Sequence, residues 1–252
     1  MRTHISFVWA ALLVLFGLAT ALPTYAAPAS ATAGDLRVAL DSLLTEHVAL
    51  ASSATNAAIG GRDAEYKAAV AALDANSVDL SKAIGSVYGA DAENAFLSLW
   101  RKHIGFFVDY TQGAAAKDQA KKDKAMADLT QYGQDFGAFL NSANPNLPKQ
   151  AVADLLAPHV KTLTSVIDAQ AAGDPATAFM NERMAFAHMT NIATALSNAI
   201  VKQFPDKFGG GAAMPAVMPN TGAADVAGYG STIVLAIALM ALGLIVTRRR
   251  AA

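Results

Sequence analysis

The chain has 252 residues, of which 54% are hydrophobic, and its 19 basic and 20 acidic residues leave a formal net charge of −1. A chain of this length suffices for one large hydrophobic core. The near-zero charge argues against a nucleic-acid-binding surface, because such surfaces concentrate lysine and arginine. The chain has no cysteine, so disulfide bonds cannot hold the fold together and burial must stabilise it.

The beginning of the chain is typical of a secretory signal peptide, which we assign to residues 1–26. Arg2 precedes an apolar run over residues 5–22, and small residues end the segment. Such a run is short for a transmembrane helix. An uncleaved membrane anchor is the alternative interpretation, but Pro23 interrupts a helix there. We therefore expect cleavage before Ala27 and export of the rest of the chain.

Residues 27–208 are predicted to form one all-α domain. Apolar residues recur at helical spacing through nearly every window of this segment, and no convincing strand pattern appears. The densest charge cluster, residues 117–124, alternates in sign, which is typical of a solvated helix turn. Breaks in the helical pattern, most of them at glycine, proline or asparagine, predict six helices. We expect these helices over residues 35–59, 63–88, 91–115, 119–142, 148–171 and 175–203.

The six predicted helices repeat with a period of about 56 residues. In the first helix of each unit this period aligns a leucine and, four residues later, a histidine, in the pairs Leu43 and His47, Leu99 and His103, Leu155 and His159. In the second helix it aligns the apolar residues Leu80, Phe136 and Ile192. A period of this length predicts αα-hairpins. The expected architecture is a six-helix bundle built as three αα-hairpin repeats around a shared core.

Four histidines are predicted to face the interior of this bundle. His47, His103 and His159 lie on the apolar stripes of the first helices, and His188 lies on the last helix. An imidazole at such a position is unfavourable unless a partner satisfies its ring nitrogens. If the four converge, the partner could be a metal ion, a haem, or a hydrogen-bonded network with Glu46, Asp109 and Glu182.

Neighbouring methionines bear on which metal the histidines would bind. Imidazoles without thiolates suit zinc, copper, nickel or iron. Met180, Met184 and His188 follow one another at four-residue spacing, so we expect them to form one ridge. Thioether beside imidazole favours copper, particularly Cu(I), with zinc as the second choice. Alternatively, the methionines only fill space in the core.

Three segments of the domain carry distinctive motifs: LWRKHIGFFVDY at 99–110, ERMAFAHM at 182–189 and LSNAIVKQFPDKF at 196–208. On these segments the chain resembles an uncharacterised extracytoplasmic helical domain of bacteria, often labelled copper amine oxidase N-terminal domain-containing. The resemblance implies an exported helical domain but no oxidase activity. Amine oxidase catalysis uses a tyrosine within Asn-Tyr-Asp or Asn-Tyr-Glu, and this sequence has neither tripeptide.

The end of the chain is typical of a surface anchor. Residues 209–229 are mostly glycine, alanine, proline and methionine, which is the composition of a flexible stalk. Residues 230–247 are apolar enough to enter a membrane as a transmembrane segment. The arginines within residues 248–252 are expected to stay in the cytoplasm.

A short motif in the stalk indicates how the domain is attached. Met218-Pro219-Asn220-Thr221-Gly222 precedes the apolar segment. This three-part tail resembles the sorting signal of sortase substrates, with Met218 where the LPxTG motif of that family has leucine. The resemblance implies transient binding to a sortase, cleavage between Thr221 and Gly222, and attachment to the cell envelope. An ordinary transmembrane anchor is the alternative, and either one would display the domain outside the cytoplasm.

The expected function is that of a surface-tethered metal-binding module and not an enzyme, with copper or zinc as the ion. A structural or adhesive scaffold with core histidines is the first alternative. A dimetal redox enzyme would use Glu-x-x-His pairs on facing helices, and the sequence has none. A haem-binding domain would need two axial histidines.

Overall fold

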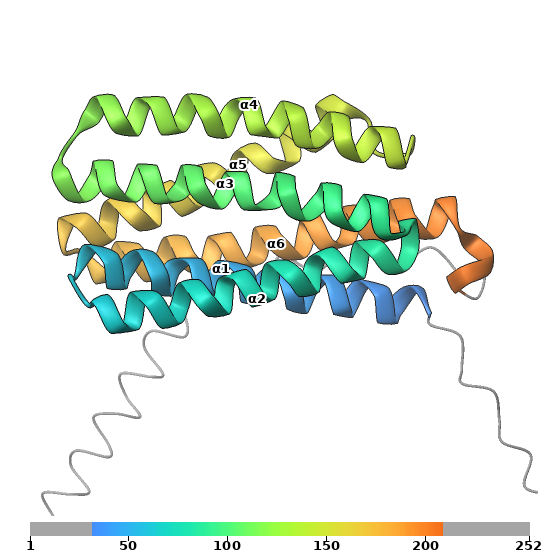
Figure 1. The fold of residues 1–252 in the computed structure, drawn as a ribbon, viewed down its shortest axis with the longest axis horizontal. Helices are drawn as coiled ribbons and strands as arrows, with labels where there is room; N and C mark the ends of the chain where they lie inside the picture. The colour runs from blue at the N-terminus through green and yellow to red at the C-terminus, as the bar shows by residue number, and fades with distance from the viewer. Residues whose placement is uncertain (1–31, 209–252) are drawn as a thin grey trace, which may run out of the picture.

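The computed structural model describes residues 32–208, and all regular structure within them is helical (Figure 1). The elements are α1 (Ala33–Ile59), α2 (Asp63–Tyr88), α3 (Ala90–Ala116), α4 (Gln119–Ala143), α5 (Lys149–Ala172), α6 (Pro175–Gln203) and a short 3-10 helix, η1 (Pro205–Phe208). The all-α prediction is confirmed, and the six predicted helices match α1 to α6 with ends that differ by at most two residues.

Several predicted features lie outside the described residues. They are the signal peptide at 1–26, the stalk at 209–229 with its sorting motif, the apolar segment at 230–247 and the basic end at 248–252. Among residues 32–208, no helix is both long enough and apolar enough to cross a membrane.

The six helices form a closed ring in which each packs on the next and α6 returns to pack on α1. Helices α1, α3 and α5 run in the same direction and also contact one another, so they form the inner part of the bundle (Figure 1). Each of α2, α4 and α6 contacts the two inner helices beside it. The arrangement is that of three αα-hairpins around a pseudo-threefold axis. Residues 33 and 208 lie at the same end of the bundle (Figure 1).

The turns inside the hairpins repeat the 56-residue period in their backbone conformation. Gly61, Lys117 and Gly173 have φ angles of 64°, 57° and 69°, and each stands between the two helices of its hairpin. Glycine adopts this left-handed conformation without steric cost, which explains two of the three positions. Asp118 and Asp174 follow in the second and third hairpins, and each accepts a hydrogen bond from a backbone N–H three residues later at 3.0 Å. These side chains start α4 and α6.

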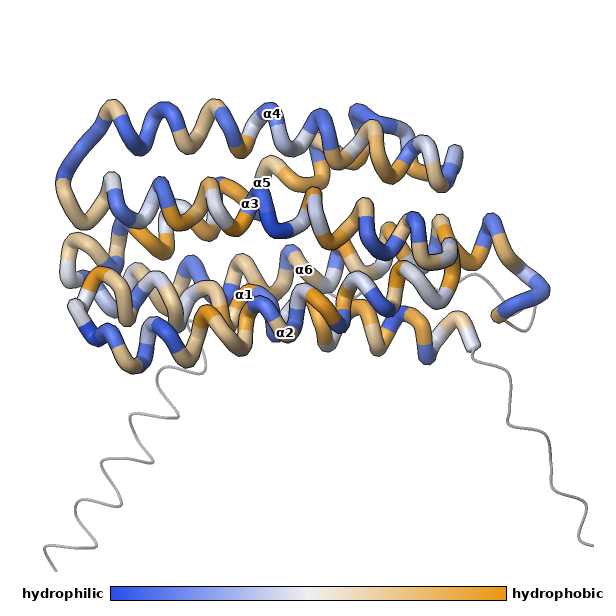
Figure 2. Tube along the Cα trace, viewed as in Figure 1, coloured by the Kyte–Doolittle hydropathy of each residue, from blue (hydrophilic) through white to orange (hydrophobic). Residues whose placement is uncertain are grey.

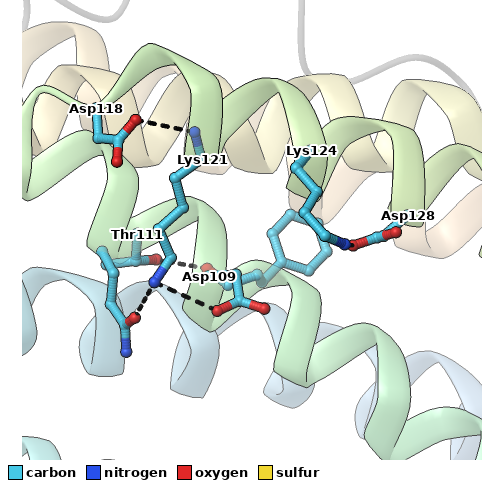
Figure 3. A network of polar contacts seen from close by, with 8 residues as sticks. Asp109, Thr111, Asp118, Lys121, Lys124 and Asp128 are labelled. Atoms are coloured by element: carbon cyan, nitrogen blue, oxygen red, sulfur yellow. Dashed lines mark hydrogen bonds and ion pairs between the residues drawn. The ribbon is translucent and has the colours of Figure 1, made fainter.

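The charged run that we expected to be a solvated turn joins α3 to α4. Asp118 caps α4, and the Lys121 ammonium lies 3.5 Å from the Asp109 carboxylate on α3 (Figure 3). Lys124 pairs with Asp128 at 2.6 Å one turn further along (Figure 3). These groups are exposed or half-buried at the surface, so the ion pairs stabilise the fold only slightly.

The core is built in layers that follow the repeat. Figure 2 shows apolar residues recurring along each helix between polar ones. One register position per helix supplies a layer of buried residues: Leu40, Leu80, Phe96, Phe136, Val152 and Ile192. A second layer is buried three turns away on the inner helices and two turns away on the outer ones: Ala51, Leu73, Phe107, Leu129, Leu163 and Ala185. The aligned histidines occupy the register between these two apolar layers.

Candidate metal centre

Three histidines meet at the centre of the bundle. His47 on α1, His103 on α3 and His159 on α5 are buried, with exposed fractions of 1%, 3% and 4%. Each offers a ring nitrogen, and these nitrogens all lie within 4.8 Å of one another. The Nε2 atoms of His47 and His103 are 3.4 Å apart.

Their meeting follows from the repeat. The three residues share one register position on three parallel helices that contact one another. A residue that faces the pseudo-threefold axis from one inner helix therefore meets its two equivalents at the axis. The helical periodicity that orients each histidine inward and the period of 56 residues together place the three rings at the same level.

The protein itself satisfies these rings poorly. A separation of 3.4 Å is longer than the usual 2.7–3.2 Å of a hydrogen bond to nitrogen. The Nδ1 atoms of all three rings are buried and have no hydrogen-bond partner among the described residues. A buried polar atom without a partner costs roughly 1–3 kcal/mol. The nitrogens of His47 and His103 that approach each other are the Nε2 atoms, so an ion between these two rings would be bound through Nε2 and not through the partnerless Nδ1 atoms.

The surroundings keep the imidazoles neutral. Burial lowers the pKa of His47 to about 4. Burial, followed by the charges of His47 and His188, lowers the pKa of His159 to about 3. The pKa of His103 lies well below its ordinary value, again because of burial first and the two neighbouring histidines next. A neutral imidazole carries one nitrogen lone pair, which is the form that binds a metal ion.

Two aromatic side chains that we did not single out in the sequence form a wall beside the histidines. The ring of Trp100 lies 4.9 Å from that of His47 and 4.5 Å from that of His103. The ring of Tyr132 stacks on His103 at 5.0 Å. The Trp100 Nε1 and Tyr132 Oη atoms are buried without a described partner. Trp100 lies three residues before His103, one helical turn away, which is the signal that could have identified it.

The fourth histidine lies outside the cluster. His188 is half-buried on α6, and its Nε2 atom lies 2.6 Å from the carbonyl oxygen of Leu155, to which it donates a hydrogen bond. The first repeat has the same contact, because Asn76 donates to the carbonyl oxygen of Leu43 at 3.0 Å. His188 therefore occupies the position of an inter-helix hydrogen-bonding residue.

The predicted methionine ridge does not face the interior. Met180 is 57% exposed and Met184 is 44% exposed, which corrects the expectation that their thioethers lie beside the metal-binding imidazoles. The buried stripe of α6 instead runs through Ala178, Asn181, Ala185 and Met189. Met180 and Met184 each lie one residue before a member of this stripe, about 100° away around the helix.

Two of the acidic residues considered as partners for the histidines, Glu46 and Asp109, are engaged elsewhere, and the potential metal-binding group does not include Glu182. Glu46 accepts a hydrogen bond from Asn76 at 2.8 Å. Asp109 pairs with Lys121 at the surface. In residues 32–208 the potential metal-binding group consists of His47, His103 and His159, without a carboxylate. A transition-metal ion is therefore a better match to this chemistry than magnesium or calcium, which prefer oxygen ligands.

Comparisons of the chain with protein families, with curated proteins and with solved structures find no match.

Proposed function

We propose that this protein is a surface-tethered module that binds one transition-metal ion, zinc or copper, through His47, His103 and His159. The observation that carries the proposal is the convergence of three buried, neutral imidazoles whose ring nitrogens lie within 4.8 Å of one another. An ion would hold one nitrogen of each ring. Its ligands would come from three helices, so binding would also link the three repeats.

The spacing of the nitrogens supports a tetrahedral ion. Metal–nitrogen bonds of about 2.0–2.1 Å place two ligands of a tetrahedron about 3.3–3.4 Å apart. The Nε2 atoms of His47 and His103 have this separation at 3.4 Å. The widest separation in the cluster is at most 4.8 Å, so binding requires an inward movement of at most about 1.4 Å. A change of side-chain torsion angles can provide this.

The ligand set bears on the choice of metal. The reason for preferring Cu(I) was the pair Met180 and Met184, and their exposure removes it. Three imidazoles without thiolate or thioether suit Zn(II) and Cu(II). A dimetal redox site would need bridging carboxylates, and the described cluster has none. We therefore propose a mononuclear site.

The location of the module is proposed from the two ends of the sequence. A cleaved signal peptide at 1–26 and an anchor at 230–252 would hold the helical domain outside the cytoplasm, either through sortase acting at Thr221 or through the apolar segment itself. A protein there would act as a sink, sensor or delivery module for the ion. Cell fractionation with a Thr221→Ala variant separates the two kinds of attachment, because only the sortase product resists extraction by detergent.

Metal analysis of the purified chain tests the proposed site. The full-length protein, isolated without a histidine tag, is incubated with Zn(II) or Cu(II), freed of excess metal and analysed for bound ion. We expect a single ion per chain, and free metal at 100 times the Kd should stabilise the fold by about 2.7 kcal/mol. The variants His47→Ala, His103→Ala and His159→Ala should each lose both effects.

His188→Ala is the matched control, because this histidine lies on α6 outside the cluster. It should lose about 1 kcal/mol of stability with its hydrogen bond and still bind the ion. Wild-type protein that binds no metal would refute the proposal. Equal loss of metal in all four variants would refute the assignment of the three ligands.

A further inference from the structure

A cavity of about 290 Å³ lies between α1, α2 and α3, and two of the three histidines line it. His47 and His103 contribute to its wall, whereas His159 does not. Most of the remaining lining is apolar, and it contains neither lysine nor arginine. Asp63 and Val70 also line the cavity and are exposed to solvent, so the cavity connects the histidines to the surface.

The first repeat makes this cavity because its side chains are small at two register positions. Ala51 and Ala54 on α1 both line it. The equivalent positions of the other repeats carry larger, buried side chains: Phe107 and Leu163 correspond to Ala51, and Tyr110 and Val166 correspond to Ala54. The hollow therefore breaks the threefold symmetry of the bundle on one side of the histidines.

The opposite side of the histidines is closed. The rings of Trp100 and Tyr132 pack against His103 there. The space left beside them is about 40 Å³ and is lined almost entirely by apolar side chains such as Leu44 and Phe136. This space is large enough for a water molecule. Of these two spaces beside the histidines in residues 32–208, the cavity next to Ala51 and Ala54 is much the larger.

We propose that the metal ion keeps a fourth coordination position that faces this cavity, and that a small neutral or singly negative ligand binds there from solution. The inference rests on the proposed function. Three protein ligands with one open position is the arrangement of zinc sites that bind water or an external molecule. The carboxylate of Asp63 and the lack of basic residues in the lining disfavour anions of higher charge.

Cobalt(II) and azide test this position. Co(II) replaces zinc in tetrahedral sites, and its visible absorption bands change when a ligand is exchanged. The full-length protein is loaded with Co(II) and titrated with sodium azide at constant ionic strength. We expect intense tetrahedral bands that shift in a saturable manner as azide binds. Absence of such bands would overturn the metal site itself. Bands that do not change on addition of azide would overturn only the open coordination position.

Variants that fill the cavity with the side chains of the third repeat test whether azide binds through it. Ala51→Leu introduces the residue that the third repeat has at Leu163, and Ala54→Val copies Val166 in the same way. Both should keep the Co(II) bands and weaken azide binding by tenfold or more, because the new side chains occupy the cavity. Ala39→Leu, the same change at an exposed position of α1, is the control and should bind azide as wild type does.

Two variants are used because either one could disturb the packing, and circular dichroism establishes which of them is folded. Azide affinity equal to wild type in a folded, Co(II)-loaded variant would show that the ligand does not enter through this cavity, and the inference would be wrong.

Discussion

Asn144 donates a hydrogen bond from its side-chain amide to the hydroxyl oxygen of Tyr88 at 3.1 Å, and the two residues occupy the same register position of successive repeats. The same amide also donates to the backbone oxygen of Ala199 on α6 at 2.9 Å. The Tyr88 hydroxyl in turn donates to Gln203 at 2.9 Å. One buried side chain therefore joins the C-terminal ends of α2, α4 and α6.

Replacing Asn144 with alanine should destabilise the protein by about 2–3 kcal/mol. It removes the two hydrogen bonds that the amide donates and the two that its oxygen accepts from Asn146, and it leaves a cavity. Urea unfolding monitored by circular dichroism measures the change. Ser142→Ala, at an exposed site one residue before the end of α4, serves as the control and should change stability by less than about 0.5 kcal/mol. A loss below 1 kcal/mol for Asn144→Ala would show that the network contributes little.

Two glycines one turn apart on α4 should respond in opposite ways to alanine. A Cβ atom at Gly137 would collide with the backbone oxygen of Lys149, where α4 and α5 approach closely. A Cβ atom at Gly133 would meet only the Cα atom of Ala153 at 3.9 Å, an ordinary contact. We expect Gly137→Ala to cost about 1–3 kcal/mol through overpacking and Gly133→Ala to add about 0.5–1 kcal/mol through helix propensity. Thermal unfolding of the two variants measures these changes. Equal shifts in melting temperature would contradict the close approach of α4 and α5 at Gly137.

Replacing both Met180 and Met184 with leucine should leave Cu(I) binding almost unchanged, because both side chains are largely exposed. We expect a change in Kd of less than about threefold, or about 0.7 kcal/mol. Competition with a coloured Cu(I) chelator measures it, with His103→Ala as the variant that should fail to bind. Weakening by more than tenfold in the methionine variant would mean that the thioethers reach the ion after all.

The sequence predicted the helices well because its breaks are chemically distinct. Gly61 and Gly173 have the left-handed backbone that ends a helix, and Pro175 begins α6 at its first turn, where proline is favoured. The histidine register was also readable, since His47, His103 and His159 follow one period and face one axis.

The position of the methionines could not be read in the same way. On α6 the buried stripe contains small or polar residues such as Ala178, Asn181 and Ala185, so hydrophobicity alone points wrongly to Met180 and Met184. The buried stripe is set by the neighbours that α6 packs against, α1 and α5. Residues spaced by four, such as Met180, Met184 and His188, also shift by about 40° around the helix at each step, so they do not share a single face. The cavity could not be predicted from the sequence either, because the small side chains of Ala51 and Ala54 leave a space only where α1 packs against α2 and α3.

The last prediction concerns the metal-free protein in acid. The pKa of His47 is lowered to about 4 and that of His159 to about 3, and the pKa of His103 is also well below its ordinary value of 6.5, all chiefly through burial. Above pH 6.5 these rings are neutral in both the folded and the unfolded chain, and they add no pH dependence. Below pH 6.5 the three histidines bind protons in the unfolded chain but stay neutral in the folded chain. The free energy of unfolding should then fall until the folded pKa values are reached.

Each such histidine contributes a slope of about 1.4 kcal/mol per pH unit, so three contribute about 4 kcal/mol per unit in the steep part of the range, between about pH 6 and 4. Typical domains have only about 5–15 kcal/mol of stability, so the metal-free protein should lose much of its stability by pH 5. Urea unfolding in the presence of a chelator at pH 7.5, 6.5, 5.5 and 5.0 measures this slope. His47→Gln should reduce it by about a third, since one proton fewer is taken up. Stability that stays constant from pH 7.5 to 5.0 would mean that the folded protein accepts protons at these rings, which contradicts their burial as neutral groups.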